Sequence, residues 1–340
     1  MQRCLTIAAK GLGQVAPNPM VGCVIVFNDE IISEGYHQEY GGLHAEPNAL
    51  KKVDEALLKE CTLYVNLEPC SHYGKTPPCA DLIISKGLKK VVIGNLDTNP
   101  LVAGKGIKKL QDAGIIVEYG VLNEACRELN KRFFTFHEKN RPYLILKWAQ
   151  TQDGFISQYP VPANKEENWI TGPESKRLVH QWRTEEQAIL IGYNTALMDN
   201  PLLTARLATG KNPLRIVIDQ HLELPKHLAI FNEDAKTIVF NSKEAVLKNN
   251  IEFVKINFAV LFPQLLNELY LKNISSVIIE GGTKTLNQLI AQNFWDEARV
   301  FVNPTKYFTQ GIKAPDIILS DANKQNSGKD ILYTIKNPKQ

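Results

Sequence analysis

Four side chains of this sequence, at the start of two predicted helices and after one predicted strand, are able to build a single metal centre. His44 and Glu46 open one predicted helix, Cys70 follows the predicted strand TLYVNLEP, and Cys79 opens the predicted helix CADLIISKG after two prolines. Backbone N–H groups and the dipole at a helix N-terminus favour the thiolate that zinc needs. The fold must therefore bring two helix N-termini and one strand end together.

The residue types at these positions suit a catalytic metal. Imidazole and two thiolates bind zinc, and three protein ligands leave a fourth position for water. Zinc lowers the pKa of bound water towards neutrality, and Glu46 then stands ready to move its proton. The alternatives are that His44 is a core histidine and that the cysteines form a structural zinc site or simply pack. The four residues together favour catalysis.

The first part of the chain alternates strand-like and helix-like segments. Predicted strands are GCVIVF, TLYVNL, KVVIG and IIVEYG, and predicted helices follow His44, start at Cys79 and end near Ala113. Strands over 21–27 and 31–33 are joined by Asn28-Asp29, which indicates a hairpin turn. This order predicts an α/β sandwich with a mixed sheet, followed by a helix over 123–134.

The polar segment HEKNRPY then precedes a new alternating pattern, so we place a domain boundary near Arg141, between 1–141 and 142–340. The second part has predicted strands AILIG, RIVID, TIVF, SVIIE and ARVFV and helices near 174–184 and 260–271, again α/β. Neither part contains GxGxxG after a strand. The polar segment from about Ala322 is expected to be loosely ordered.

Composition limits the partners of this chain. Its 340 residues favour two domains, and its net charge of +3 forms no polybasic tail or stripe. No apolar stretch approaches the roughly 20 residues that span a bilayer, and the start lacks a continuous signal-peptide core. Cys4, Cys23, Cys61 and Cys126 lie among apolar neighbours and are expected to be buried. We expect a cytoplasmic protein with a small-molecule substrate, without a nucleic-acid or membrane partner.

The metal motif carries a resemblance to a known family. The zinc-dependent cytidine-deaminase superfamily usually has H-x-E followed by P-C-x-x-C, whereas SHYGKTPP separates Cys70 from Cys79 here. With APNPMVGCVIV, GGLHAEPNAL and EPCSHYGKTPPC, the chain resembles the bifunctional deaminase/reductase family of riboflavin biosynthesis along essentially its whole length. The resemblance implies a cytidine-deaminase-like α/β/α sandwich over 1–141, with zinc on His44, Cys70 and Cys79 and Glu46 as the catalytic residue.

The same resemblance implies a substrate for this half. The family removes the amino group at C2 of a diaminopyrimidinone that carries a phosphoribosylamino group. The loop over 72–76 would help to hold it, with Lys75 either on the phosphate or simply solvated. Asn18 either hydrogen-bonds the substrate or shapes the turn between two prolines.

The second half resembles the family's NADPH-dependent reductase, a dihydrofolate-reductase-like α/β domain over 142–340. The matching segments are LKWAQTQDGFIS, NWITGPESKRLVHQWR, ILIGYNTALMDNPLLTAR and IIEGGTKTLNQLI. The implied reaction delivers a hydride to C1 of the ribose and gives a ribityl product, and the implied assembly is a homo-oligomer joined through the reductase halves. Implied NADPH contacts are Ala149, Trp169, Thr195, Asp199 and Gly282; implied substrate contacts are Arg183, Leu203, Arg206 and Glu280.

Some of these residues have a physical interpretation of their own. Gly281 and Gly282 would let the backbone approach a phosphate at a helix N-terminus. Trp169 either stacks on a flat ring or is a partly buried anchor. Arg183 and Arg206 either hold phosphate through forked hydrogen bonds or form surface ion pairs.

Four positions of the second half need separate treatment. Glu167 stands where the family has a serine that contacts substrate, and Asn200 replaces the second acid of Asp-Asp-Pro. The serine contact is therefore not carried over to Glu167. Lys147 and Asp153 are only candidates for the reductase cleft.

Two rival functions remain at this level. A nucleic-acid or nucleoside base deaminase with a degenerate second domain would use the same zinc chemistry, but it would need a basic or aromatic strand-binding surface. A non-catalytic module with a structural zinc would need a closed site with four ligands.

Overall fold

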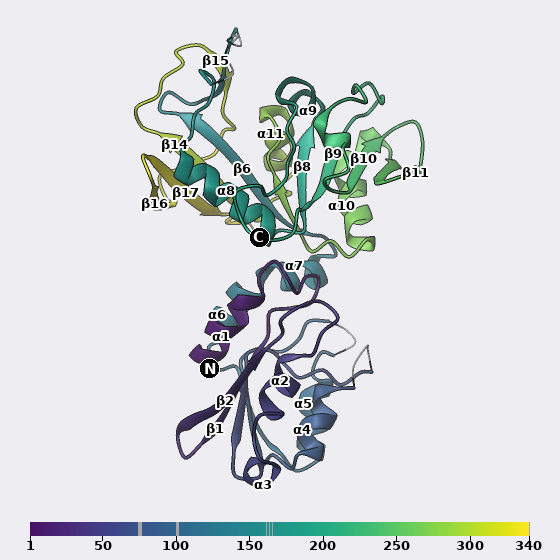
Figure 1. Ribbon diagram of the computed structural model, residues 1–340, viewed down its shortest axis with the longest axis vertical. Helices are drawn as coiled ribbons and strands as arrows, with labels where there is room; N and C mark the ends of the chain where they lie inside the picture. The colour runs from purple at the N-terminus through teal and green to yellow at the C-terminus, as the bar shows by residue number, and fades with distance from the viewer. Residues whose placement is uncertain (74–76, 100–101, 161, 163, 165, 340) are drawn as a thin grey trace. The chain divides into compact units, whose positions relative to one another are not determined.

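The computed structural model describes residues 1–73, 77–99, 102–160, 162, 164 and 166–339 (Figure 1). These residues form two compact units, Met1–Arg141 and Pro142–Gln340, each built on its own sheet. Lys75 lies outside the described residues.

The first unit is a five-stranded mixed sheet in the order β2-β1-β3-β4-β5. β1 is antiparallel to β2 and β3, whereas β3, β4 and β5 are parallel. The strands are β1 Gly22–Phe27, β2 Glu30–Tyr36, β3 Thr62–Val65, β4 Lys90–Ile93 and β5 Ile116–Tyr119. The helices are α1 Gln2–Ala8, α2 Ala45–Leu50, α3 Glu55–Leu58, α4 Cys79–Ser85, α5 Lys105–Asp112, α6 Asn123–Leu129 and α7 Lys131–Lys139.

Alternating side chains give this sheet two buried faces, because successive residues of a strand point to opposite sides. One core joins Ile25, Leu63 and Ile93 to the helices α2, α4 and α5. The other joins Val24 to Cys4 and Ile7 of α1. The expected α/β/α sandwich is therefore confirmed, and so is the hairpin turn, where Asn28 and Asp29 have φ of 48° and 63°.

The single helix expected over 123–134 is wrong, because the chain forms two helices that meet at Asn130. Asn130 is buried, and its side chain accepts a hydrogen bond from the Met20 N–H at 2.8 Å and donates one to the Met20 carbonyl at 2.9 Å. Its backbone, at φ −102° and ψ 24°, departs from α-helical geometry. α7 also extends to Lys139, so HEK is helical rather than part of a linker.

The second unit contains a ten-stranded sheet in the order β11-β12-β10-β9-β8-β13-β6-β14-β17-β16, and the run from β12 to β14 is parallel. The strands are β6 Tyr143–Thr151, β7 Phe155–Gln158, β8 Ala188–Gly192, β9 Leu214–Ile218, β10 Thr237–Asn241, β11 Val246–Lys248, β12 Ile251–Lys255, β13 Ser276–Ile279, β14 Glu297–Asn303, β15 Gly311–Lys313, β16 Asn323–Ser327 and β17 Asp330–Lys336. The helices are α8 Pro173–Glu185, α9 Tyr193–Asp199, α10 Leu261–Leu271 and α11 Thr283–Ala291.

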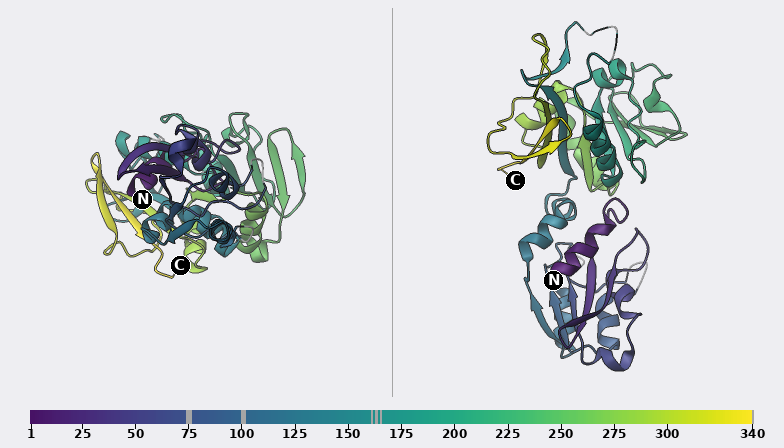
Figure 2. Two further views of the ribbon diagram at one scale, coloured as in Figure 1. Left: turned by 90° about the horizontal axis from the view of Figure 1, so that it is seen from below. Right: turned by 60° about the vertical axis from the view of Figure 1, so that its left-hand side comes forward.

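Helices cover both faces of this sheet (Figure 2), as parallel sheets require. One core packs Leu146, Leu190 and Phe240 against α10 and α11. The other packs residues of β6, β8, β9, β10 and β13 against Val179 and Trp182 of α8. The carboxyl ends of the parallel strands consequently share one edge of the sheet.

The expectation of a loosely ordered segment after Ala322 is wrong. β16 pairs with β17, and β17 pairs with β14 at the end of the sheet. Leu332 is buried in one core, while Tyr333 and Ile335 pack against the other. Successive residues point to opposite faces of the sheet, so β17 contributes apolar side chains to both cores.

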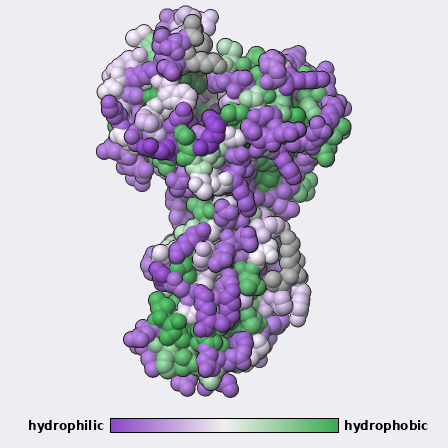
Figure 3. Space-filling view, in the orientation of Figure 1, coloured by the Kyte–Doolittle hydropathy of each residue, from purple (hydrophilic) through white to green (hydrophobic). Residues whose placement is uncertain are grey.

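One face of the molecule is largely polar. Figure 3 shows hydrophilic residues over most of the visible face, with apolar residues in smaller groups. Among the described residues, no helix combines the length and apolar character needed to cross a bilayer.

Candidate zinc and cofactor sites

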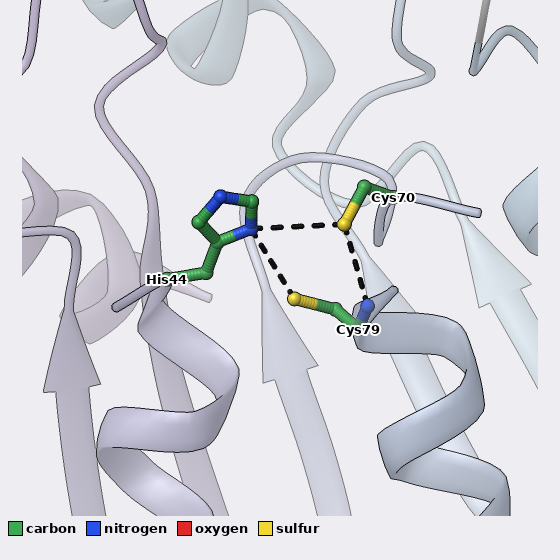
Figure 4. Close-up of side chains that lie close together, drawn as sticks. All are labelled: His44, Cys70 and Cys79. Carbon is green, nitrogen blue, oxygen red and sulfur yellow. Dashed lines mark hydrogen bonds between the residues drawn. The ribbon is translucent and has the colours of Figure 1, made fainter. Parts of the chain in front are cut away.

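Three ligand atoms converge in the first unit (Figure 4). His44 Nδ1 lies 3.3 Å from Cys79 Sγ and 3.6 Å from Cys70 Sγ, and the three atoms all lie within 4.8 Å of one another. His44 is the N-cap of α2, Cys79 is the first residue of α4, and Cys70 follows β3. One nitrogen and two sulfurs are a donor set that zinc accepts, and they are fewer than the four that a closed structural site uses.

Close contact between strand β2 and helix α2 sets the position of His44. A Cβ added at Gly35 would lie 2.4 Å from the Ala49 nitrogen and 2.7 Å from the Ala45 carbonyl oxygen. Only glycine allows this approach, so the helix that begins after His44 rests directly on the strand.

Glu68 fixes the segment that carries Cys70. Its buried carboxylate accepts hydrogen bonds from the N–H groups of Asp97, Gly104, Gly106 and Ile107, at 3.2, 3.0, 2.9 and 3.2 Å. A carboxylate at the N-terminus of α5 also interacts favourably with the helix dipole. The segment before Cys70 is thereby tied to the loop between β4 and α5.

Local hydrogen bonds favour a thiolate at Cys70. Its sulfur accepts the backbone N–H of Cys79 at 3.3 Å. Hydrogen bonds with the Cys79 thiol and then with His44 lower the pKa of Cys70. The same hydrogen bond to Cys70 raises the pKa of Cys79. The hydrogen bond to Cys70 also raises the pKa of His44. The site is therefore prepared for a cation, which would take the place of the shared proton.

Glu46 lies in the first turn of α2, beside the ligands. Its side chain is buried, and burial raises its pKa, followed by the nearby Cys70 sulfur. Cys79 is a hydrogen-bond partner of the Glu46 carboxyl. A buried carboxyl with a raised pKa next to a metal site is suited to accept and return a proton.

Sequence reasoning missed two polar residues near this centre. The His37 ring stands edge-on to His44 with 5.4 Å between centroids, and its Nε2 lies 3.1 Å from the Asn18 amide nitrogen. Asp97 is buried, and burial, with Glu68 and Cys70 nearby, raises its pKa to about 7. Neither has a sequence spacing that links it to the metal motif. Asn18 therefore contacts a histidine of the site rather than only shaping a turn.

In the second unit, Arg183 and Glu280 form one buried ion pair. Arg183 Nε and Nη2 donate to the two carboxylate oxygens at 3.0 and 2.8 Å, and Lys147 Nζ lies 3.5 Å from Glu280 Oε2. Burial alone would raise the pKa of Glu280, but Arg183 and Lys147 lower it to about 2. Of the two alternatives for Arg183, the structure excludes an ion pair at the surface, since its side chain is only 11% exposed.

Arg206 and Leu203, two further predicted substrate contacts, differ in their exposure to solvent. Arg206 is exposed, and its Nη1 donates to the Thr204 hydroxyl at 3.0 Å, close to Arg183, which donates to the Thr204 carbonyl. Leu203 is buried in the core with φ of 58°, so only its backbone can face a ligand. Arg183, Arg206 and Glu280 thus meet around Thr204.

Two of the predicted cofactor contacts are brought together by the ends of β8 and β13. A Cβ at Gly282 would lie 3.3 Å from the Thr195 hydroxyl, and one at Gly192 would lie 2.7 Å from the Thr285 hydroxyl. Glycine at both positions allows this close packing beside the N-terminus of α11. The N–H groups at such a helix start fit a phosphate of a dinucleotide.

The remaining predicted cofactor residues lie apart from that pair in sequence and element. Trp169 is 53% exposed, and the Lys176 ammonium lies 4.7 Å from its ring centroid. Ala149 is half-buried on β6, and Asp199 is exposed at the end of α9.

Three further positions have structural partners. Asn200 has φ of 45° and accepts the Ala229 N–H at 2.7 Å, a conformation that asparagine tolerates well. Asp153 accepts the N–H groups of Phe308 and Thr309, so it anchors a loop. The Glu167 carbonyl accepts a hydrogen bond from Lys306.

Known proteins match this arrangement in both halves. Residues 1–95 match the cytidine and deoxycytidylate deaminase zinc-binding region, and residues 142–307 match the RibD C-terminal domain. The riboflavin biosynthesis protein RibD of Aquifex aeolicus is 39% identical over 99% of this chain and 97% of its own length. The Escherichia coli protein of the same name is 36% identical over 89% of this chain and 86% of its length.

Solved structures agree. A diaminohydroxyphosphoribosylaminopyrimidine deaminase/5-amino-6-(5-phosphoribosylamino)uracil reductase of Thermotoga maritima matches with a TM-score of 0.88 and 38% identity, over 99% of this chain and 97% of that one. Acinetobacter baumannii RibD matches with a TM-score of 0.87 and 29% identity, over 98% of this chain and 97% of that one. The chain therefore belongs to the RibD family, the bifunctional riboflavin biosynthesis proteins that join a zinc-binding deaminase domain to a reductase domain.

Proposed function

We propose that residues 1–141 deaminate 2,5-diamino-6-ribosylamino-4(3H)-pyrimidinone 5′-phosphate and that residues 142–340 then reduce its ribosyl group to ribityl. The convergence of His44, Cys70 and Cys79 beside the buried Glu46 carries the first half of this proposal. Zinc bound there supplies a Lewis acid that makes water a nucleophile at neutral pH. Glu46 takes a proton from the attacking water and returns protons to the ring nitrogen and to the departing amine.

The buried Arg183–Glu280 pair and Arg206 around Thr204 support the second half. Arg206 is exposed and can hold the substrate phosphate, while the paired Arg183 and Glu280 present a fixed arrangement of charges to the sugar. NADPH supplies the hydride when bound. The N-terminus of α11 at Gly282, together with Thr195, orients that cofactor, with Ala149, Trp169 and Asp199 as further contacts.

The test follows two signals in one sample that contains the diaminopyrimidinone phosphate, zinc and NADPH. Ammonia release and NADPH oxidation should both appear. Glu46→Gln should keep zinc and lower ammonia release by about 10² to 10⁴. It should leave NADPH oxidation intact when the deaminated intermediate is supplied. Glu55→Gln, the same change at an exposed position of α3, is the matched control. Near-normal ammonia release by Glu46→Gln would refute the assigned role.

Assembly and location also remain proposals. We propose a homo-oligomer joined through the reductase units, on the strength of the family resemblance. We also propose a cytoplasmic location, because the six cysteines all remain free. Light scattering of the purified chain and of a fragment over 142–340 tests the assembly. A monomeric full chain at micromolar concentration would contradict it.

A further inference from the structure

A cavity of about 530 Å³ lies at the carboxyl ends of β9, β10 and β12, away from the residues assigned above. Ligands of open α/β sheets bind outside the carboxyl ends of the strands. The cavity shares this edge with Gly192 after β8 and Gly281 after β13, since all these strands are parallel. Its polar and aromatic lining consists of Gln220, Ser242, Lys255, Asn257, Phe258 and Gln264.

The lining has one positive charge and no carboxylate. Lys255 is exposed at the end of β12, and within the described part of the chain no acid lies in salt-bridge distance of its ammonium. Asp219, at the end of β9, is occupied elsewhere because its carboxylate accepts the N–H groups of Glu223 and Leu224, both at 3.0 Å. An acid at such a strand end binds the ribose 2′-hydroxyl of NAD, whereas a nearby cation accommodates a 2′-phosphate.

The rim of the cavity is rigid. Ser242 donates both its N–H and its hydroxyl to the Gln220 carbonyl, at 2.9 and 2.8 Å, which ties the ends of β9 and β10 together. The Asn257 N–H donates to the Gln264 side chain of α10 at 2.7 Å. A fixed cavity with amides, a hydroxyl and the Phe258 ring is suited to a sugar and a flat base.

The distance to the proposed phosphate position fits one nucleotide. β8 and β9 lie between β13 and β10 in the sheet. At about 4.8 Å for each strand, the step from Gly282 to the cavity is on the order of 10 to 14 Å. We propose that this cavity receives the adenosine end of the cofactor and that Lys255 binds the 2′-phosphate, so that Lys255 selects NADPH over NADH. The inference rests on the proposed reductase function and adds the residue that sets its cofactor preference.

The experiment measures binding rather than turnover. NADPH and NADH are titrated against the full chain by nucleotide fluorescence, and adenosine 2′,5′-bisphosphate is compared with AMP as competitor. Lys255→Gln should weaken NADPH and the bisphosphate about tenfold or more, the usual effect of losing one charge-assisted hydrogen bond, and change NADH and AMP less than about twofold. Lys236→Gln, the same charge change before the opposite end of β10, is the control and should change nothing.

Three other outcomes would overturn the proposal. Unchanged NADPH preference in Lys255→Gln would exclude this cavity as the 2′-phosphate site while leaving the reductase function intact. Equal weakening of NADPH and NADH would show that Lys255 does not discriminate between them. Wild-type chain that binds neither nucleotide would refute the reductase assignment itself, and the cavity's role with it.

Discussion

Replacing Glu280 by glutamine tests whether the buried charges of the second unit hold it together. Glu280 and Arg183 are only 10% and 11% exposed, and Lys147 is 16% exposed. Glutamine keeps the shape but leaves two buried cations without a counter-charge. A fall of the Glu280 pKa from 4.5 to about 2 corresponds to about 3 kcal/mol of folding free energy at pH 7. Breaking one side of a buried ion pair costs about 3 to 5 kcal/mol, in agreement with that figure.

The assay uses urea unfolding followed by tryptophan fluorescence, because every tryptophan of the chain lies in the second unit: Trp148, Trp169, Trp182 and Trp295. The signal therefore reports that unit alone. Glu252→Gln is the matched control, since Glu252 pairs with Lys272 but is 38% exposed. Loss of this exposed ion pair should lower the free energy of unfolding by less than about 1 kcal/mol.

The pH dependence has a defined sign. The folded-state pKa of Glu280 is depressed, so its contribution is fully present above about pH 4.5 and is lost as the pH falls towards 2. The stability difference between wild type and Glu280→Gln should be constant from pH 7 to 5 and shrink below that. A difference at pH 7 no larger than that of the Glu252 control would show that the buried ion pair does not stabilise the second unit.

Two further predictions concern the first unit. Gly35→Ala should push α2 away from β2, because the new Cβ would lie 2.4 Å from the Ala49 nitrogen. Zinc affinity in a chelator competition should then fall about 10- to 100-fold, the range seen when the supports of metal ligands are lost. Gly172→Ala, where the new Cβ meets nothing closer than 3.5 Å, should keep the zinc affinity of the wild type. Equal zinc affinity of Gly35→Ala and wild type would exclude this role of Gly35. Asn130→Ala should leave the buried Met20 N–H without its acceptor and cost about 1 to 3 kcal/mol, measured as faster hydrogen exchange of that amide. Unchanged exchange would show that the Asn130 contact is dispensable.

Local chemistry explains why the fold class and the zinc motif were visible in the sequence. Strand and helix periods alternate regularly, and turn residues such as Asn28-Asp29 mark their limits. The metal ligands and Glu46 occupy the first turns of α2 and α4 or follow β3, and such positions have strong local signals. The resemblance to the family added the reductase half.

Sequence patterns failed where a distant contact overrides a local preference. The break at Asn130 depends on hydrogen bonds to Met20, far away in the chain. β16 is entirely polar, and it forms because β17, itself paired with β14, offers it a partner.

The two-part α/β organisation, the donor set for zinc and the family could all be inferred from the sequence. The burial of Arg183 against Glu280, in contrast, is visible only once the chain has folded. The physical reason is the distance along the chain between the residues that interact. Helix starts, turns and strand periods depend on residues close in sequence, whereas burial, ion pairing and cavities depend on strands that are adjacent in the sheet and remote in the chain.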